Sequence, residues 1–455
     1  MTSAESSDTP LALKPRATWR ESMAVYLQPR VLIVLLLGFS SGLPLALSGS
    51  TLLVWMRESG VDLGTIGLFA LVGTPYTLKF LWAPLVDALH VPLFTRRFGR
   101  RRGWLVFSQL LLIAAILLLA LTDPARSPLF VALGALLVAA MSSTQDIVVD
   151  AFRVESLPES EQAAGMASYV AAYRIGMLVS TVGALYFVTG FEELGYARPA
   201  AWAAGYIVMA ALVGIGIVTT LLATEPEKSV AAAAEHAAHP ENPLKRVAKT
   251  AYGAFAEFLT RDAAVVILVF VVFYKFCDAF AGIMTAPFVI DLGFTRTDYA
   301  NIVKGAGLAA TLIGGFAGGA LARAYPLATV LWVGAILQMA SNLMFSWQAM
   351  VGLNHWALIV TIVVENFTGA IGTVIFVAYL SALCKNPLHT ATQFALLTAL
   401  AAVGRTYLSA GAGYLAAATG WPLFFALSAL TALPGLVLLA WLQRRGHFAT
   451  LVSKI

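Results

Sequence analysis

The chain has 455 residues, of which 59% are hydrophobic and only 12% are charged, and its mean hydropathy is +0.81. A soluble domain of this size cannot bury so much apolar surface, and a formal net charge of +5 does not suggest a nucleic-acid binder. The two cysteines, Cys277 and Cys384, fall in or beside apolar segments and give neither a disulfide framework nor a zinc-binding spacing. The composition therefore predicts an all-α integral membrane protein with many spans.

The first 30 residues are polar and contain Pro10, Pro15 and Pro29. They lack the short apolar core and the small-residue cleavage site of a signal peptide, so we expect the first spanning helix to act as an uncleaved insertion signal. A helix needs about 20 mostly apolar residues to cross a bilayer. Twelve segments meet this requirement: 31–56, 64–89, 103–122, 128–152, 164–190, 201–223, 263–290, 299–322, 327–350, 356–383, 391–416 and 421–442.

The basic residues are distributed unevenly between the connections. The connections on one side of the membrane carry only Arg57, Arg126, Arg198 and Arg296, whereas the N-terminal segment, the other connections and the C-terminal tail hold most of the remaining Lys and Arg. Because Lys and Arg accumulate in cytoplasmic loops, we expect both termini in the cytoplasm. An even number of spans agrees with that orientation.

The longest connection, at about 224–262, contains AAAAEHAAHPENPLKRVAK and is rich in alanine and charge. We interpret it as a cytoplasmic linker with an amphipathic helix near 243–260 on the membrane surface. It divides the spans six and six, which favours two bundles related by an axis along the membrane normal. The predicted domains are a cytoplasmic N-terminal segment (1–30), an N-terminal six-helix bundle (31–223), the linker (224–262), a C-terminal six-helix bundle (263–442) and a cytoplasmic tail (443–455).

Several ionisable residues fall inside the predicted spans. Such a group costs at least about 2.5–3.5 kcal/mol near the bilayer centre and usually faces a cavity or a partner. More of these residues are basic than acidic, so a cavity that they line would attract an anionic solute. The candidates are Lys79, Asp146, Arg174, Lys275, Asp278, Lys304, Glu365 and Arg405.

The stretch MSSTQDIVVDAFRVE places two aspartates four residues apart near one end of the fourth span. Asp150 lies almost at the end of that span, where it can pair with Arg153 in a gating network. Asp146 lies about 9 Å inside the end of the span, and a carboxyl in that low dielectric is expected to exchange a proton if it lacks a partner. The alternative is a permanent ion pair that never titrates. The neighbouring Gln145 is a candidate substrate contact.

Spans 7 and 10 each carry a second group of polar residues. Lys275 and Asp278 lie three apart near the middle of span 7 and share a helix face, so they line a cavity or form a structural pair. Glu365, followed by Asn366, has no partner three or four residues away in span 10. We take Glu365 and Asp278 as further proton-coupling candidates and Asn366 as a substrate contact, against the alternative of structural hydrogen bonding between helices.

Cationic and aromatic side chains supply the remaining substrate-binding candidates. Arg174 and Arg405 can clamp a carboxylate or phosphate with two parallel hydrogen bonds, or else tie helices together through carbonyl groups. Lys79 lies nearer a membrane face, where its side chain can reach the interface instead. Tyr173 and Tyr274 can stack on a sugar, although packing explains most aromatic rings in membrane helices.

Motifs for catalysis and for cofactors are not found in the sequence. It has no phosphate-binding GxxxxGK[ST], no HExxH, no third glycine after Gly305 and Gly307 to complete a dinucleotide fingerprint, and no metal-ligand spacing among its six histidines. We therefore expect no cofactor and no metal, and an intramembrane enzyme is only a weak alternative.

Motifs spread over most of the membrane region resemble the muropeptide permeases, the AmpG-like family of the major facilitator superfamily. The matching stretches, between about residues 38 and 405, are GFSSGLPLALSGSTLLVWM, KFLWAPLVD, FGRRRGW, QDIVVDAFRVE, AAYRIGMLVS, FYKFCDAF, VVENFTGAIGT and TQFALLTALAAVGR. The resemblance implies a major facilitator fold with twelve transmembrane helices in two six-helix bundles. It matches Asp146 and Asp150 to the family's acidic motif. It matches Asp87, Arg100, Arg101 and Arg102 to the gating loop between spans 2 and 3.

The resemblance also implies a function. The family imports N-acetylglucosaminyl-1,6-anhydro-N-acetylmuramyl peptides, which are peptidoglycan fragments, across the bacterial inner membrane for cell-wall recycling, and in some Gram-negative bacteria this import signals β-lactamase induction. We therefore expect a monomer that carries an anionic glycopeptide together with protons. The best-known family member has two further C-terminal spans, whereas this chain ends soon after span 12. A permease for a siderophore or another anionic solute, and a membrane sensor that transports nothing, are the alternatives.

Overall fold

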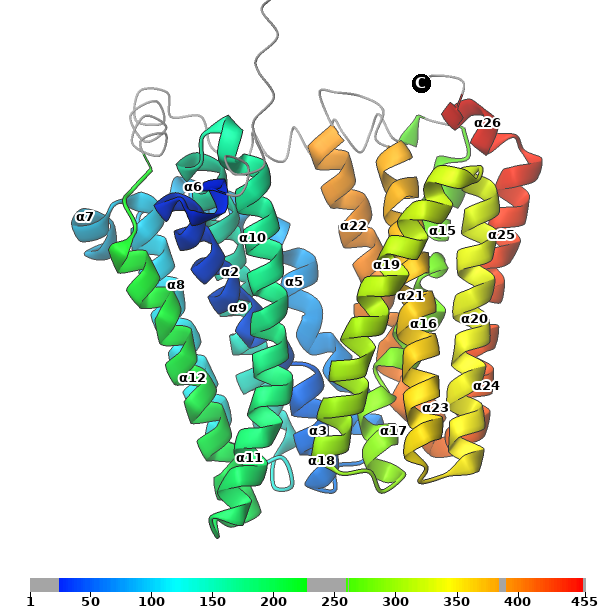
Figure 1. Cartoon of the computed structure of the whole chain (residues 1–455), viewed down its shortest axis with the longest axis horizontal. Helices are drawn as coiled ribbons and strands as arrows, with labels where there is room; N and C mark the ends of the chain where they lie inside the picture. The colour runs from blue at the N-terminus through cyan, green and yellow to red at the C-terminus, as the bar shows by residue number, and fades with distance from the viewer. Residues whose placement is uncertain (1–23, 227–258, 261, 384–389, 453–455) are drawn as a thin grey trace, which may run out of the picture.

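The computed structural model is entirely helical in the part of the chain that it describes (Figure 1). Ten of the described helical stretches are long and apolar enough to cross a membrane. Two interrupted stretches, 63–88 and 390–419, complete the twelve predicted spans, and the observed bounds agree with the predicted ones to within a few residues. The described residues are 24–226, 259–260, 262–383 and 390–452, so most of the predicted linker at 224–262, with its helix near 243–260, lies outside them.

The N-terminal half contains six spans. Its elements are η1 (Val25–Leu27), α2 (Pro29–Leu47), α3 (Ser50–Glu58), α4 (Leu63–Leu68), η2 (Phe69–Gly73), α5 (Thr74–Leu78), η3 (Lys79–Leu81), α6 (Ala83–Ala88), α7 (Phe94–Phe98), α8 (Arg100–Ala120), α9 (Pro128–Ser156), α10 (Glu159–Leu178), η4 (Val179–Gly183), α11 (Ala184–Glu193) and α12 (Arg198–Leu222). The Asp62 carboxylate accepts hydrogen bonds from the Thr65 side chain and backbone, which cap α4 and hold the pKa of Asp62 below its usual range.

The C-terminal half contains the other six spans. Its elements are α15 (Ala264–Tyr274), α16 (Phe276–Gly282), α17 (Thr285–Asp291), α18 (Arg296–Asp298), η5 (Tyr299–Ala306), α19 (Gly307–Ala324), α20 (Leu327–Val351), α21 (His355–Leu383), α22 (Thr390–Thr406), η6 (Leu408–Gly411), α23 (Ala412–Thr419), α24 (Trp421–Leu430), α25 (Leu433–Arg444) and α26 (His447–Val452). The segments η4 and η5 are π-helical, and such segments are frequent at functional sites.

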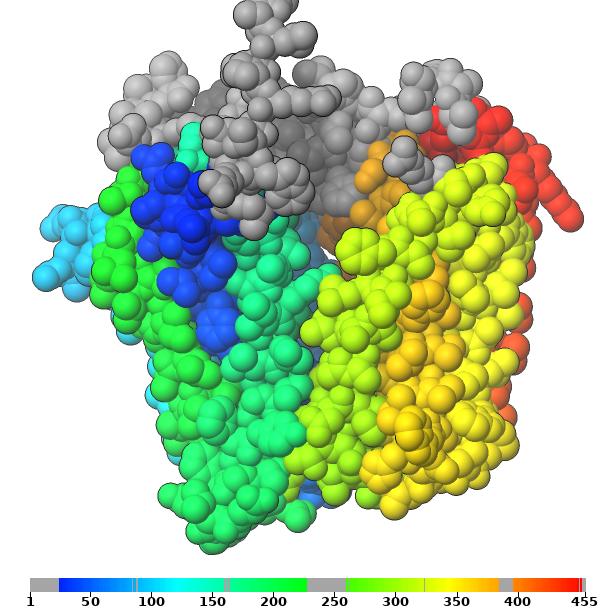
Figure 2. Space-filling model, in the orientation of Figure 1, coloured from blue at the N-terminus to red at the C-terminus, as the bar shows by residue number. Residues whose placement is uncertain are grey.

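The two halves stand side by side with their spans roughly parallel (Figure 1). The start of α2 and the short helix α26 lie at the same face, which is the upper face in Figure 1, and we call it the terminal face. The halves meet at the opposite face, where α3 contacts α17, α4 contacts α23, and α11 contacts α18. Between the upper parts of α10 and α19 the surface is hollowed (Figure 2).

Glycines allow α2 and α10 to approach closely enough for backbone contact. A Cβ atom at Gly42 would lie 2.1 Å from the Tyr173 carbonyl oxygen, and one at Gly38 would lie 2.6 Å from the Tyr169 carbonyl oxygen. This small-residue packing is typical of membrane helices. It brings both tyrosines of α10 next to the polar face of α2.

The GGFAGG stretch at 314–319 packs in the same way in the other half. A Cβ atom at Gly314 would lie 2.3 Å from the Phe367 carbonyl oxygen, and one at Gly318 would lie 2.9 Å from the Ile371 Cα atom. These glycines therefore serve close helix packing. The close contact between α19 and α21 fixes the position of the polar residues on α21.

Candidate functional site

The first polar cluster of the site lies in the N-terminal half, around Asp146 of α9. The Asp146 side chain is only 6% exposed and accepts a short hydrogen bond from the Ser41 hydroxyl of α2. The Ser41 oxygen lies 3.4 Å from the Tyr169 hydroxyl of α10, and Tyr169 in turn stacks at an angle on Tyr173. Three helices therefore converge on one buried carboxyl, and the close packing of α2 on α10 makes this possible.

The two aspartates of α9 have different surroundings but share a cation. Asp150 lies 3.8 Å from Arg153, which confirms the predicted local pair. Lys79, on the interrupted second span, interacts electrostatically with both Asp146 and Asp150. The deep carboxyl and the one near the helix end thus compete for the same ammonium group.

The second polar cluster lies in the C-terminal half. The Lys275 Nζ atom lies 2.7 Å from the Asp278 carboxylate and donates a 3.4 Å hydrogen bond to the Gly369 carbonyl of α21. Lys275 itself stands between α15 and α16 with a non-helical backbone. This break lets its side chain reach both α16 and α21, so the residue joins two spans in addition to pairing with its neighbour.

Glu365 belongs to the same cluster, although its own helix offers no partner three or four residues away. Its carboxylate accepts a 2.6 Å hydrogen bond from the Asn366 amide and interacts electrostatically with Asp278, Lys275 and Lys304. As the sequence indicated, Glu365 has no partner three or four residues away; its hydrogen bond comes from the adjacent Asn366, and its electrostatic partners lie on other helices. Lys304 also lies over the Tyr299 ring, 5.5 Å from its centroid.

Arg405 of α22 interacts with the first cluster across the space between the halves. It is an exposed residue, and its guanidinium interacts electrostatically with Tyr173 of α10 in the other half. The next residue, Thr406, is buried, and its hydroxyl lies 3.0 Å from the Thr77 hydroxyl. Arg405 therefore lies next to a direct contact between the halves, and Lys79 is two residues beyond Thr77 in the chain.

Ion pairs close the molecule at the opposite face. The buried Arg296 guanidinium at the start of α18 lies 2.6 Å from Glu58 and 2.5 Å from Glu192, and both carboxylates come from the other half. Arg57 pairs with Asp291, which is a second link between the halves. We call these five residues the closure network.

Close helix packing and one hydrogen bond accompany the closure network. A Cβ atom at Gly413 would lie 1.8 Å from the Leu63 carbonyl oxygen, so α23 and α4 touch along their backbones. The Tyr186 hydroxyl donates a 2.8 Å hydrogen bond to Asn301 across the halves. The halves are thus joined at the opposite face, and the surface between α10 and α19 is hollowed nearer the terminal face (Figure 2).

Residues 34–405 match the Major Facilitator Superfamily. The chain is also 40% identical over 419 residues to the anhydromuropeptide permease of Escherichia coli strain K12, covering 92% of this chain and 80% of that protein. The chain belongs to the Major Facilitator Superfamily, among the AmpG-like permeases. A putative AmpG 4 transporter of Rickettsia felis is 33% identical, with 91% of this chain and 97% of that protein covered.

Solved structures show the same fold in more distant transporters. A POT family transporter in complex with 5-aminolevulinic acid has a TM-score of 0.67 at 12% identity, over 90% of this chain and 95% of that chain. A D-xylose–proton symporter has a TM-score of 0.65 at 12% identity, over 91% and 97% of the two chains. The predicted fold is therefore confirmed, and the family places this AmpG-like chain among membrane transporters.

The arginines of the predicted gating loop lie at the terminal face of this AmpG-like permease. Arg100 and Arg101 lie 3.6 Å and 2.5 Å from the carboxylate of Glu155 at the end of α9. The Glu225 carboxylate accepts hydrogen bonds from the backbone N–H groups of Arg101 and Arg102, so it caps the start of α8. The Asp87 side chain lies outside the described part of the structure, and the gating role of Asp87 and these arginines stays a prediction.

Three predicted substrate contacts lie away from both clusters. Tyr274 is buried, and its hydroxyl donates to the Leu331 carbonyl in the core of the C-terminal half. Gln145 is fully buried, and its amide has no hydrogen-bond partner among the described residues. Arg174 is exposed on α10 beside the exposed Ile175, and the structure brings it to neither cluster.

Sequence reasoning missed the closure network and the roles of Ser41 and Tyr169. The sequence does contain one signal of ion pairing at that face. The connections there carry few arginines, and Arg57 and Arg198 lie close to acidic residues. That signal indicates ion pairing, but it does not say which residues pair across the halves. Among the described residues, no group of His, Cys, Asp and Glu could hold a metal ion.

Proposed function

We propose that this chain imports anhydromuropeptides, which are peptidoglycan fragments, across a bacterial inner membrane by alternating access. The observation that carries the proposal is the 40% identity to the E. coli anhydromuropeptide permease over 92% of this chain. The terminal face is the cytoplasmic one in this proposal, because basic residues accumulate there. The hollow toward the terminal face and the closed opposite face support an inward-facing state.

The charges of the site suit an anionic glycopeptide. Arg405, Lys275 and Lys79 present cationic groups around the space between the halves, and Tyr173 adds a ring and a hydroxyl group beside Arg405. A guanidinium binds a carboxylate through two parallel hydrogen bonds, and an aromatic ring suits the apolar face of a sugar. We propose Arg405 as the main carboxylate contact and Tyr173 as the sugar contact.

In this proposal, transport is coupled to protons because the ionised carboxylates of the site and the anionic substrate compete for the same lysines. Asp146 interacts electrostatically with Lys79 while the carboxyl is ionised, and protonation of Asp146 removes that attraction. The ammonium group of Lys79 then becomes available to an anionic substrate. Glu365 and Asp278 stand in the same relation to Lys275 in the other half, so each cluster contains a candidate carrier of the proton.

The two polar clusters and the closure network suffice for the transport cycle that we propose. We propose that the substrate and a proton enter from the periplasm while the closure network is open, that the two bundles (31–223 and 263–442) then rock about the site, and that both ligands leave to the cytoplasm. A single chain contains both clusters and the closure network, so we propose a monomer as the working unit.

The experiment that tests this function is competition for uptake. Proteoliposomes containing the full chain are given radiolabelled anhydromuropeptide, with excess unlabelled anhydromuropeptide or excess unlabelled siderophore. Competition by the muropeptide alone supports the proposal. Saturable uptake of a radiolabelled siderophore but not of the muropeptide would assign the chain to a different anionic solute, and absence of saturable uptake of either by folded protein would favour a sensor.

A further inference from the structure

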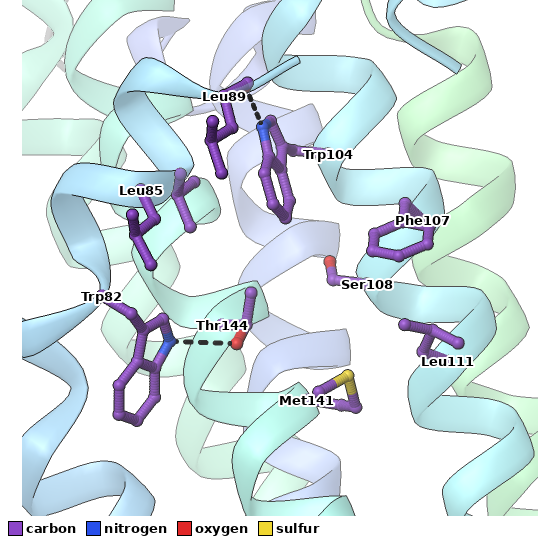
Figure 3. A pocket seen from close by; sticks show the side chains of 10 residues that line it. Trp82, Leu85, Leu89, Trp104, Phe107, Ser108, Leu111, Met141 and Thr144 are labelled. Carbon is purple, nitrogen blue, oxygen red and sulfur yellow. Dashed lines mark hydrogen bonds between the residues drawn. The ribbon is translucent and has the colours of Figure 1, made fainter. Parts of the chain in front are cut away.

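A groove of about 230 Å³ opens in the N-terminal half, and its lining contains none of the charged residues of the two polar clusters (Figure 3). This volume is below the roughly 300–1,000 Å³ of typical sites for small soluble ligands. No residue of the C-terminal half contributes to the groove. Its lining comes from three neighbouring spans and consists of Trp82, Leu85, Val86, Leu89, Trp104, Phe107, Ser108, Leu111, Met141 and Thr144.

The few polar atoms in the lining already have partners. The Trp82 indole N–H donates to the Thr144 hydroxyl at 3.2 Å, and the Trp104 indole N–H donates to the Leu89 carbonyl at 2.8 Å (Figure 3). The Ser108 hydroxyl donates to the Leu105 carbonyl at 3.1 Å. With its polar atoms satisfied, the groove offers an occupant only apolar contact.

The groove has an exposed apolar rim and lies within the depth of one leaflet. Leu89 and Leu111 are 52% and 39% exposed on that rim. The α8 residues of the lining run from Trp104 to Leu111, which is about 10 Å at 1.5 Å per residue. Half of the hydrocarbon core of a bilayer is about 15 Å thick, so the groove extends over much of one leaflet.

Positive charge lies at the end of the groove nearest the terminal face. The short helix α7 projects sideways there (Figure 1), and the ring of its Phe94 lies 5.9 Å from the ring of Phe107 in the groove lining. Arg96 and Arg97 of α7 are exposed, and neither forms an ion pair among the described residues. An apolar groove within one leaflet thus lies close to a helix that carries two exposed arginines.

We propose that this groove holds one acyl chain of an anionic phospholipid whose phosphate binds Arg96 and Arg97. Guanidinium groups bind phosphate through charge-assisted hydrogen bonds, and basic residues beside a membrane span attract anionic lipids. The apolar lining supplies the contact for the chain, and α7 supplies the contact for the headgroup. The bound lipid would steady α9, because Thr144 in the lining is two residues from Asp146.

Native mass spectrometry of the purified full chain tests this inference. The protein is titrated with phosphatidylglycerol and, separately, with phosphatidylcholine of the same acyl chains. We expect one phosphatidylglycerol to bind at least fivefold more tightly than phosphatidylcholine. Leu111→Trp fills the groove, and Arg96→Ala with Arg97→Ala removes the headgroup contact, so each change should abolish that preference.

Matched control variants distinguish lipid binding in the groove from non-specific binding of lipid elsewhere on the protein. Leu118→Trp adds the same ring at an exposed site of α8 beyond the groove, and Arg444→Ala with Arg445→Ala removes two exposed arginines at the terminal face of the other half. Both controls should keep the preference for phosphatidylglycerol. Equal binding of the two lipids, or an unchanged preference in Leu111→Trp, would overturn the inference. This experiment measures lipid binding and not transport, so a negative result would leave the proposed transport function unaffected.

Discussion

Replacing Arg296 by methionine should open the face that the closure network seals. The guanidinium of Arg296 bridges Glu58 and Glu192, and it also lies over the Trp202 ring, 5.7 Å from the centroid. Methionine fills much of the volume but removes the cation between the two carboxylates, so that Glu58 loses its ion-pair partner and Glu192 keeps only the exposed Arg198. Opening exposes them to water, so the penalty falls mainly on the closed state.

The size of the effect follows from burial. Removing one partner of a fully buried ion pair costs about 3–5 kcal/mol, whereas an exposed pair contributes about 1 kcal/mol or less. The Arg296 side chain is 8% exposed, and those of Glu58 and Glu192 are 12% and 24% exposed. The loss should therefore lie between these cases, at about 2–3 kcal/mol. Because 1.4 kcal/mol is a tenfold change, the ratio of closed to open molecules should fall roughly 30- to 150-fold.

Spin labels across the closed face measure that ratio. Tyr196 and Leu353 are exposed beyond α11 and α20, one in each half, and can be replaced by labelled cysteines after Cys277 and Cys384 are changed to serine. Double electron–electron resonance should show a new, longer distance between the two spin labels in the Arg296→Met variant.

Arg198→Met is the matched control for this experiment. Arg198 also pairs with Glu192, at 3.3 Å, but it is 59% exposed and both residues belong to the N-terminal half. The control should keep the wild-type distance distribution. If Arg296→Met also kept it, or if both variants lengthened it equally, the assignment of the closure network would be refuted.

Three further substitutions test other parts of the structure. Gly413→Ala should weaken closure in the same spin-label assay because its Cβ atom would meet the Leu63 carbonyl oxygen, whereas Gly411→Ala, which has no atom within 4 Å of the added carbon, should leave closure unchanged. Arg405→Gln should weaken binding of radiolabelled anhydromuropeptide at least tenfold, because a charge-assisted contact worth about 1.5–3 kcal/mol is lost. An unchanged affinity would exclude Arg405 as the carboxylate contact. Arg102→Ala should lower the free energy of unfolding by about 1–2 kcal/mol, because two hydrogen bonds to carbonyl groups at the end of α12 are lost. Denaturant unfolding in detergent measures this loss, and an unchanged midpoint would contradict a stabilising role of Arg102.

Features that depend on neighbouring residues in the sequence could be predicted. A span is recognisable because the apolar requirement acts on about 20 consecutive residues, and this gave all twelve spans to within a few residues. The Lys275–Asp278 and Asp150–Arg153 pairs were predictable because residues three apart share a helix face.

Contacts between distant helices could not be predicted in this way. Ser41 and Asp146 are 105 residues apart, and Glu58 and Arg296 are 238 residues apart, so no local spacing connects them. Their contacts depend on how each helix is rotated against its neighbours.

Helix rotation also separates residues that look alike in the sequence. Tyr173 and Tyr274 both lie next to a basic residue of a span. The close approach of α2 and α10 turns Tyr173 toward Asp146 and Arg405. The other tyrosine packs on Phe376 inside its own half. The sequence therefore identifies the polar residues of the spans, and the packing of the helices selects those that form the site.

Uptake of radiolabelled anhydromuropeptide into proteoliposomes, with and without an inward proton gradient, tests the central claim most directly. We predict accumulation above equilibrium only with the gradient in the wild type. In the Asp146→Asn or the Glu365→Gln variant, we predict loss of accumulation while exchange of labelled for unlabelled substrate continues. Accumulation without a gradient, or undiminished gradient-driven accumulation when both carboxyls are replaced, would contradict proton coupling through these residues.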